Sequence, residues 1–137
     1  MNSVLKEDLD EIVNSDTIDW NNLKDKSIFI TGATGLIGSI LVKALLMKNK
    51  KENLNIKLFL LVRNEEEANK IFPNEGDIYY IISSVENYEP QDLKIDYIIH
   101  GASPTKSKFF MEEPVETMDI SIIGTKKILE QAKKSDV

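Results

Sequence analysis

The chain has 137 residues, of which 42% are hydrophobic and 29% charged, a composition typical of one globular domain and not of a disordered or collagenous chain. Its 17 basic and 23 acidic residues give a net charge of −6, which disfavours a general nucleic-acid-binding surface because phosphate contacts need clustered Lys and Arg. The absence of cysteine excludes disulfides, thiolate metal sites and cysteine catalysis, and a single histidine excludes a histidine-rich metal site.

No apolar stretch approaches the length of a membrane span. The longest unbroken apolar runs, Leu58–Val62 among them, have five residues, whereas a span needs roughly 18. The N-terminal stretch is acidic and lacks the apolar core of a secretion signal. We therefore expect a cytoplasmic protein whose partners include neither a membrane nor a nucleic acid.

Residues 1–25 are expected to form an acidic leader helix and a linker. They carry seven acids and two lysines, and residues 3–13 show apolar side chains at a helical spacing. Trp20 and Leu23 are expected to hold this segment against the main body. The remainder, residues 26–137, is predicted to be a single domain.

From residue 26 onward, short apolar runs alternate with helical patterns. The runs are rich in β-branched or aromatic residues, and they predict four strands: Ser27–Thr31, Lys57–Val62, Ile78–Ser83 and Ile95–His100. The helical patterns predict three helices: 36–48, Glu65–Phe72 and 114–134. Strands that alternate with helices predict an α/β fold with a doubly wound parallel sheet, here of strand order 3-2-1-4.

Each of the two longer helices shows an apolar face, which a helix normally buries. In 36–48 this face begins with Leu36 and Ile37. In the last helix it comprises Val115, Met118, Ile122, Thr125, Leu129 and Ala132. A doubly wound sheet adds a further strand after this point, and only three residues follow Lys134, so we expect the sheet to be truncated and the catalytic half to lie outside this chain.

The stretch from Ile28 to Gly38 is the most informative, because a predicted strand leads through three glycines, spaced G-x-x-G-x-x-G, directly into a helix. Gly32 permits a tight turn, Gly35 lets a pyrophosphate approach the backbone, and Gly38 lets the helix pack against the strand. The free amides of the helix start would face the anion. An ordinary turn with coincidental glycines is the alternative.

Three blocks resemble one family. Thr31–Gly38 resembles the cofactor loop of the extended short-chain dehydrogenases/reductases, the NAD-dependent epimerase/dehydratase group that acts on nucleotide sugars. Asp96–Pro104 resembles that family's fourth strand, and Ser121–Glu130 resembles its following helix. The resemblance covers residues 20–134 and implies a Rossmann-type sheet that binds NAD or NADP.

The resemblance also implies a set of site residues at the carboxyl ends of the strands. Those expected to contact the cofactor are Gly32, Thr34, Gly35, Leu36, Ile37, Gly38, Arg63, Ser84, Val85, Gly101, Ala102 and Ser103. Ser103 and Lys106 are the candidates for substrate contact, although Lys106 can equally be a surface lysine. His100 is expected to be a packed, hydrogen-bonded residue and not a catalyst, and Phe109–Met111 a packing anchor.

Arg63 leaves the choice of cofactor open. It lies 25 residues after Gly38, where an acid would bond the adenosine ribose and indicate NAD. A guanidinium can pair with a 2′-phosphate, which favours NADP, or stack on adenine; a solvated arginine is the structural alternative. Ser84 stands where the family usually has an acid, and its oxygen can still hydrogen-bond the adenine amino group; a plain polar loop is the alternative.

The family's catalytic pair is missing. Its chemistry uses a Tyr-x-x-x-Lys pair, in which tyrosine is the base while the cofactor takes and returns a hydride. None of the four tyrosines has a lysine four residues later, so we expect no catalytic residue here and no activity from this chain alone.

We therefore expect the cofactor-binding N-terminal part of a nucleotide-sugar epimerase, dehydratase or decarboxylase, with a homodimer as one candidate assembly. The alternatives are a non-catalytic dinucleotide-binding module and an NADP-dependent carbonyl reductase.

Overall fold

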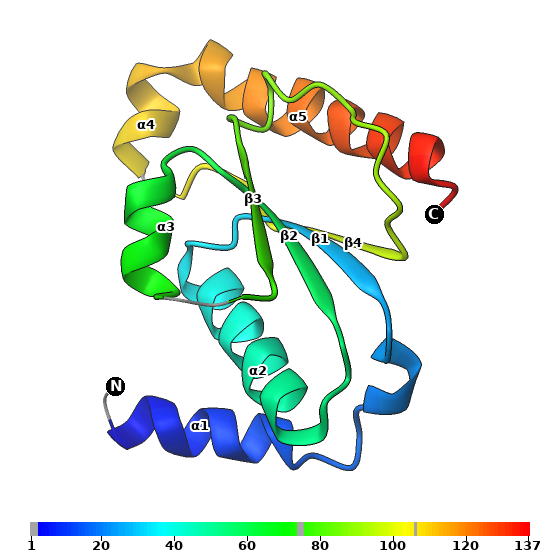
Figure 1. Cartoon of the computed structure of the whole chain (residues 1–137). Coiled ribbons are helices and arrows are strands. Elements are labelled where there is room, and N and C mark those ends of the chain that lie inside the picture. The colour runs from blue at the N-terminus through cyan, green and yellow to red at the C-terminus, as the bar shows by residue number, and fades with distance from the viewer. Residues whose placement is uncertain (1–2, 74–75, 106) are drawn as a thin grey trace.

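The computed structural model describes residues 3–73, 76–105 and 107–137 and has a four-stranded parallel sheet with helices on both faces (Figure 1). The strands are β1 (Ser27–Thr31), β2 (Lys57–Val62), β3 (Ile78–Ile82) and β4 (Tyr97–His100), in the order β3-β2-β1-β4. All three pairings are parallel. The predicted fold class and strand order are confirmed.

Two strands are shorter than predicted. β3 ends at Ile82, one residue early, and β4 begins at Tyr97 and not at Ile95. The late start of β4 has a local cause. The Asp96 carboxylate accepts the backbone N–H of Ser27 at 2.8 Å, and it forms an ion pair with Lys26 at 3.1 Å. These contacts, with the Ser27 hydrogen bond as the largest cause, lower the pKa of Asp96.

The predicted helices are present, and two short ones were missed. The helices are α1 (Ser3–Val13), α2 (Leu36–Glu52), α3 (Glu65–Ile71), α4 (Ser107–Glu112) and α5 (Pro114–Ser135), together with the 3₁₀ helix η1 (Trp20–Leu23). Sequence patterns predicted neither η1 nor α4. In Figure 1, α1, α2 and α3 lie on one side of the sheet and α5 crosses the other side.

The two central strands, β1 and β2, are buried on both faces, and their side chains alternate between two cores. Ile28 and Ile30 of β1 join the core beneath α2 and α3, whereas Phe29 points to α5. We call these the α2-side core and the α5-side core. The α5-side core consists of Phe29, Leu61, Val85, Tyr88, Ile95 and Ile128. The continuous apolar run in β2 splits between the two cores in the same way, as expected for a central strand.

The N-terminal segment is attached to the body at two points. Leu9 and Val13 of α1 are buried against Ala44 of α2. Trp20 is buried in the α2-side core with Leu23 packed beside it, which confirms the predicted anchor.

The apolar face predicted for the last helix is wrong. Val115, Met118, Ile122 and Leu129 are 59–64% exposed, and α5 packs instead through Gly124, Ile128 and Gln131. A Cβ on residue 124 would lie 2.7 Å from Val85 Cγ1, so only glycine lets the helix approach this closely. We call the four exposed residues the α5 stripe.

Gln131 fixes α5 to the segment that leads into β4. Its Oε1 accepts from the Tyr88 hydroxyl at 2.6 Å and from the Gln91 amide at 2.8 Å, and its Nε2 donates to the Gln91 carbonyl at 3.1 Å. Burial raises the pKa of Tyr88, so the hydroxyl remains a donor at neutral pH. Gln131 is fully buried, which makes these contacts hard to replace with water.

We expect Gln131→Leu to lower the free energy of unfolding by about 2–3 kcal/mol, because it leaves a buried hydroxyl and backbone groups unsatisfied. Urea denaturation followed by circular dichroism measures this loss. The exposed Lys133→Ala on the same helix is the control and should change stability by less than about 0.5 kcal/mol. A loss for Gln131→Leu as small as that of the control would contradict the prediction.

Candidate cofactor-binding site

The site lies where the carboxyl ends of β1 and β4 meet. These strands are neighbours in the sheet although they are distant in sequence, and Thr31 pairs in register with His100. In doubly wound sheets the strand order reverses at this point, and ligands bind in the crevice outside the carboxyl ends of the strands. The glycine loop follows β1 and Gly101–Ser103 follow β4, so the two predicted segments come together here.

Gly32 makes the turn that was predicted. Its φ is +72°, in the region that favours glycine, and its carbonyl accepts the Gly35 amide at 3.1 Å. A Cβ here would lie 2.5 Å from the Gly101 carbonyl oxygen and 2.8 Å from the Ala102 nitrogen. The turn after β1 and the backbone after β4 are therefore in direct contact.

Gly38 and Gly35 differ in how much space the fold leaves for a side chain. A Cβ on Gly38 would lie 2.1 Å from the Gly32 carbonyl oxygen, so the fold itself excludes any larger residue. Gly35 has an ordinary φ of −73°, and a Cβ there would meet only the Gly32 oxygen, at 3.3 Å. The fold therefore constrains Gly35 much less than Gly38, which suits the prediction that Gly35 makes room for a ligand.

The start of α2 presents free backbone donors. Gly35 is its N-cap and supplies no side chain, and the Ser39 amide makes the first bond, to the Gly35 carbonyl at 2.8 Å. The amides of Leu36, Ile37 and Gly38 precede this bond and have no acceptor within the helix. With the helix dipole, they form a site suited to a phosphate.

Leu36 and Ile37 do not join the core as the predicted apolar face required. They are 82% and 81% exposed, and Thr34 beside them is also exposed. Two large apolar side chains therefore stand in solvent next to an uncapped helix start. Their exposure corrects the packing prediction and leaves them available to a ligand.

Arg63 lies in an acidic surrounding. It is exposed just after β2 and has no hydrogen-bond or ion-pair partner among the described residues. The next residue, Asn64, caps α3 by accepting the Glu67 amide at 3.1 Å, and the first turn of α3 is Glu65–Glu67. These three glutamates follow Arg63 within four residues along the chain, and their negative charge opposes a 2′-phosphate near this arginine.

The two predicted cofactor contacts after β3 differ in accessibility. Ser84 is partly exposed, and its hydroxyl accepts from Asn87 at 2.9 Å, which leaves one lone pair of its oxygen for another donor. Val85 is buried in the α5-side core and packs against Gly124. Its side chain therefore serves in packing.

The segment after β4 forms the other wall. Gly101 and Ser103 are exposed and Ala102 is partly buried. Lys106, the second predicted substrate contact, lies outside the described residues. In α4, Phe110 and Met111 are exposed and Phe109 is only partly buried, so the prediction that Phe109–Met111 anchor this segment by packing is wrong for Phe110 and Met111.

His100 connects three elements at this strand end. Its Nδ1 lies 2.7 Å from Thr31 Oγ1 and its Nε2 lies 3.3 Å from Thr125 Oγ1 of α5. The predicted hydrogen-bonded role is confirmed, but the residue is exposed and not buried, and partial desolvation lowers the pKa of His100. Sequence patterns did not indicate Thr31 and Thr125 as partners of His100; a threonine that ends a strand after three apolar residues was the available signal.

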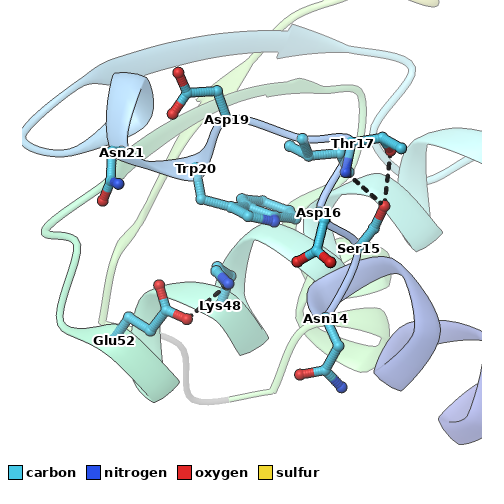
Figure 2. Close-up of a pocket in the computed structure, with 10 residues that line it drawn as sticks. Asn14, Ser15, Asp16, Thr17, Asp19, Trp20, Asn21, Lys48 and Glu52 are labelled. Carbon is cyan, nitrogen blue, oxygen red and sulfur yellow. Dashed lines mark hydrogen bonds and ion pairs between the residues drawn. The ribbon is translucent and has the colours of Figure 1, made fainter.

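A separate pocket of about 600 Å³ lies between the N-terminal segment and the end of α2 (Figure 2). Lys48 is paired with Glu52 at 2.7 Å and lies 5.1 Å from the centre of the Trp20 ring. Lys48 is twelve residues after Leu36 along α2, or about 18 Å of helix from the glycine loop. The pocket is therefore too distant to belong to the same site.

Within residues 3–73, 76–105 and 107–137, no three His, Asp or Glu side chains are grouped as metal ligands would be. None of the helices in these ranges is both long and apolar enough to cross a bilayer.

Fold and site together define a dinucleotide-binding domain of the Rossmann type. Residues 28–137 match the model of the NAD dependent epimerase/dehydratase family, and the chain belongs to this family.

Named relatives agree with this assignment. UDP-glucose 4-epimerase from Rickettsia typhi (strain ATCC VR-144 / Wilmington) is 26% identical over 117 residues, covering 82% of this chain and 34% of the relative. The same enzyme from Rickettsia bellii (strain RML369-C) is 29% identical over 112 residues, covering 79% and 33%. The chain thus spans about a third of the length of these curated relatives.

Two solved structures are similar in fold. Pen from Bacillus thuringiensis has a TM-score of 0.68 and 26% identity, with 84% of this chain and 36% of that chain covered. WbmF from Bordetella bronchiseptica, solved in complex with NAD+ and UDP, has a TM-score of 0.65 and 20% identity, with 82% and 33% covered. At this identity the second likeness shows the fold alone.

Proposed function

We propose that this chain binds NAD as the cofactor domain, residues 26–137, of an enzyme that epimerises or dehydrates a nucleotide sugar. The observation that carries the proposal is the uncapped start of α2, which follows a left-handed glycine turn at the β1/β4 crevice. The residues present fit the cofactor, because Gly35 leaves its space open and three amides face it.

In the proposed binding mode the pyrophosphate lies on the amides of Leu36–Gly38. The adenosine extends toward Arg63 and Ser84, beyond the ends of β2 and β3, with Val85 packed below. The nicotinamide half extends toward Gly101–Ser103, where small side chains leave room.

The chemistry belongs to the proposed whole enzyme. Bound NAD supplies a reversible hydride acceptor for a sugar carbon. The residues of this chain bind and orient the cofactor, and Ser103 is the proposed substrate contact at the exposed end of β4. A cytoplasmic location stays a prediction.

We expect NAD to bind at least about threefold more tightly than NADP. The three carboxylates of Glu65–Glu67 repel a 2′-phosphate beside Arg63 more strongly than the single exposed arginine attracts it. Isothermal titration with both cofactors measures the ratio. Changing the three glutamates to glutamine should raise NADP affinity and leave NAD affinity within about twofold.

Absence of NAD binding at neutral pH would overturn the proposed function. Tighter binding of NADP by the wild-type chain would overturn the cofactor choice alone and favour the carbonyl-reductase alternative.

We also propose that the protein forms a homodimer through the α5 stripe. The stripe residues follow one another at spacings of three, four and seven, as in a seam between paired helices. The first half of α5 carries Glu116 and Asp119, whereas the second half carries Lys126 and Lys133. An antiparallel second copy would place acidic half against basic half.

Light scattering after size-exclusion chromatography is expected to give twice the mass of the chain, and Ile122→Glu should give a monomer because it places a charge in the centre of the seam. Lys134→Gln changes the net charge equally, lies off the stripe, and should leave the dimer intact. A wild-type monomer at 0.1 mM would contradict the proposal.

A further inference from the structure

The hydroxyl of Thr31 is the centre of a small hydrogen-bond network at the candidate site. Its Oγ1 accepts the backbone N–H of Ala102 at 3.1 Å and lies 2.7 Å from His100 Nδ1. Thr31 is almost fully buried, at 1% exposed, so water does not substitute for these partners.

The hydrogen-bond partner of His100 Nε2 determines which ring nitrogen carries the proton. Thr125 donates its own hydroxyl proton to the Ser121 carbonyl at 2.6 Å, so toward His100 it acts as an acceptor. His100 Nε2 therefore carries hydrogen and donates to Thr125 at 3.3 Å. Nδ1 is left as the acceptor for the Thr31 hydroxyl, and the neutral imidazole satisfies every partner.

This network reaches the glycine turn through the backbone after β4. The Gly101 amide donates to the Thr31 carbonyl at 3.1 Å, and the Ala102 amide donates to the Thr31 hydroxyl. The Gly101–Ala102 peptide is the same one that a Cβ on Gly32 would strike at 2.5–2.8 Å. The orientation of one hydroxyl thus bears on how the two walls of the crevice fit together.

We propose that neutral His100 is a positioning residue that holds the Gly101–Ala102 backbone against the Gly32 turn through Thr31, and that its protonation weakens dinucleotide binding. A proton on Nδ1 makes that nitrogen a donor. Thr31 Oγ1 then receives two donors, and its own proton has no acceptor in the network. The proposal rests on the proposed function for its effect on affinity, but not for the network itself.

The surroundings of the ring contain no compensating charge in the described residues. On β1 and β4 the flanking residues are Ile30, Gly32, Ile99 and Gly101. On α5, Lys126 pairs with Glu130 at 3.9 Å and Lys127 with Glu89 at 2.7 Å. Partial desolvation lowers the pKa of His100 below its usual 6.5. The ring therefore gains its proton only when the pH falls below about 6.5, and we expect the loss of affinity in that range.

The first test follows the network without a ligand. The chain has one histidine, so ¹⁵N NMR of the imidazole has one signal set to interpret. At pH 8 it should report hydrogen on Nε2 and none on Nδ1. Between pH 8 and 5 the Ala102 amide shift should follow His100 protonation in the wild-type chain and in Thr31→Ser, but not in Thr31→Val. A hydrogen on Nδ1 at pH 8, or an Ala102 amide that ignores His100, would overturn the proposal.

The second test measures affinity for NADH between pH 5 and 8 by fluorescence. Wild-type affinity should fall at least fivefold on acidification. His100→Asn keeps an acceptor near Nδ1 and should retain affinity within about threefold, with a flat pH profile; His100→Leu should lose about tenfold at every pH. A flat wild-type profile would overturn the proposal. Failure of NADH to bind even at pH 8 would overturn the proposed function, and the Ala102 measurement would still decide whether His100 positions this backbone.

Discussion

Gly38→Ala is expected to lower the free energy of unfolding by about 3 kcal/mol or more. The added Cβ would lie 2.1 Å from the Gly32 carbonyl oxygen and 2.9 Å from Ala33 Cα, and both are backbone atoms that cannot swing away. Overpacking in a tight core commonly costs about 1–3 kcal/mol, and a clash with backbone at this distance belongs at or above the upper end. Denaturation in urea, with cofactor absent, measures the loss.

Gly76→Ala is the matched control for Gly38→Ala. A Cβ on Gly76 would meet nothing within 4 Å, so this change should leave stability within about 0.5 kcal/mol of the wild type. If Gly38→Ala were as stable as Gly76→Ala, the close approach of α2 to the β1 turn would not be a requirement of the fold.

Gly35→Val is expected to reduce NAD affinity at least about a hundredfold, or roughly 2.7 kcal/mol, while stability changes by only about 1 kcal/mol. The backbone at residue 35 is in an ordinary extended conformation, and the fold offers a Cβ no contact closer than 3.3 Å. The valine side chain would instead occupy the space in front of the α2 amides, where we place the pyrophosphate.

Calorimetric titration with NAD measures this effect, and Gly76→Val controls for the added bulk and β-branching. Affinity within threefold of the wild type would place the pyrophosphate elsewhere. Together the Gly38 and Gly35 variants separate a glycine that the fold requires from one that ligand binding requires more than the fold does.

The glycine loop was predictable because its determinants are local. A strand, a left-handed turn and a helix start follow one another within Ile28–Gly38, and each glycine has a geometric reason visible in the spacing. The order of the strands was predictable for a similar reason, since alternation of strand and helix restricts the sheet to few topologies.

The packing of α5 was not predictable from its own sequence. Its most regular apolar pattern lies on the face that stays exposed. The face that packs was selected by a glycine that fits over Val85 and by Gln131, which reaches Tyr88 and Gln91 some 40 residues away. Helical periodicity contains no information about such distant partners.

The same limit applies to the site. Thr31, His100 and Thr125 meet from three elements separated by 69 and 25 residues. Sequence spacing identified His100 as hydrogen-bonded, but only the three-dimensional register of β1 with β4 supplies its partners. Leu36 and Ile37 show the opposite case, in which an apolar pattern extends beyond the part of the helix that is buried.

The unequal cores on the two faces of the sheet have a consequence for local unfolding. Among the described residues, the α2-side core contains fourteen buried residues and the α5-side core six, so α5 is held by much less apolar contact than α2. Regions with few buried contacts open at lower free energy than the rest of a domain. Amides of α5 should therefore exchange with solvent through partial openings that leave β1, β2 and α2 intact. In such an opening the contact between His100 and Thr125 is lost while the glycine turn persists, so the two walls of the crevice differ in how long each stays formed.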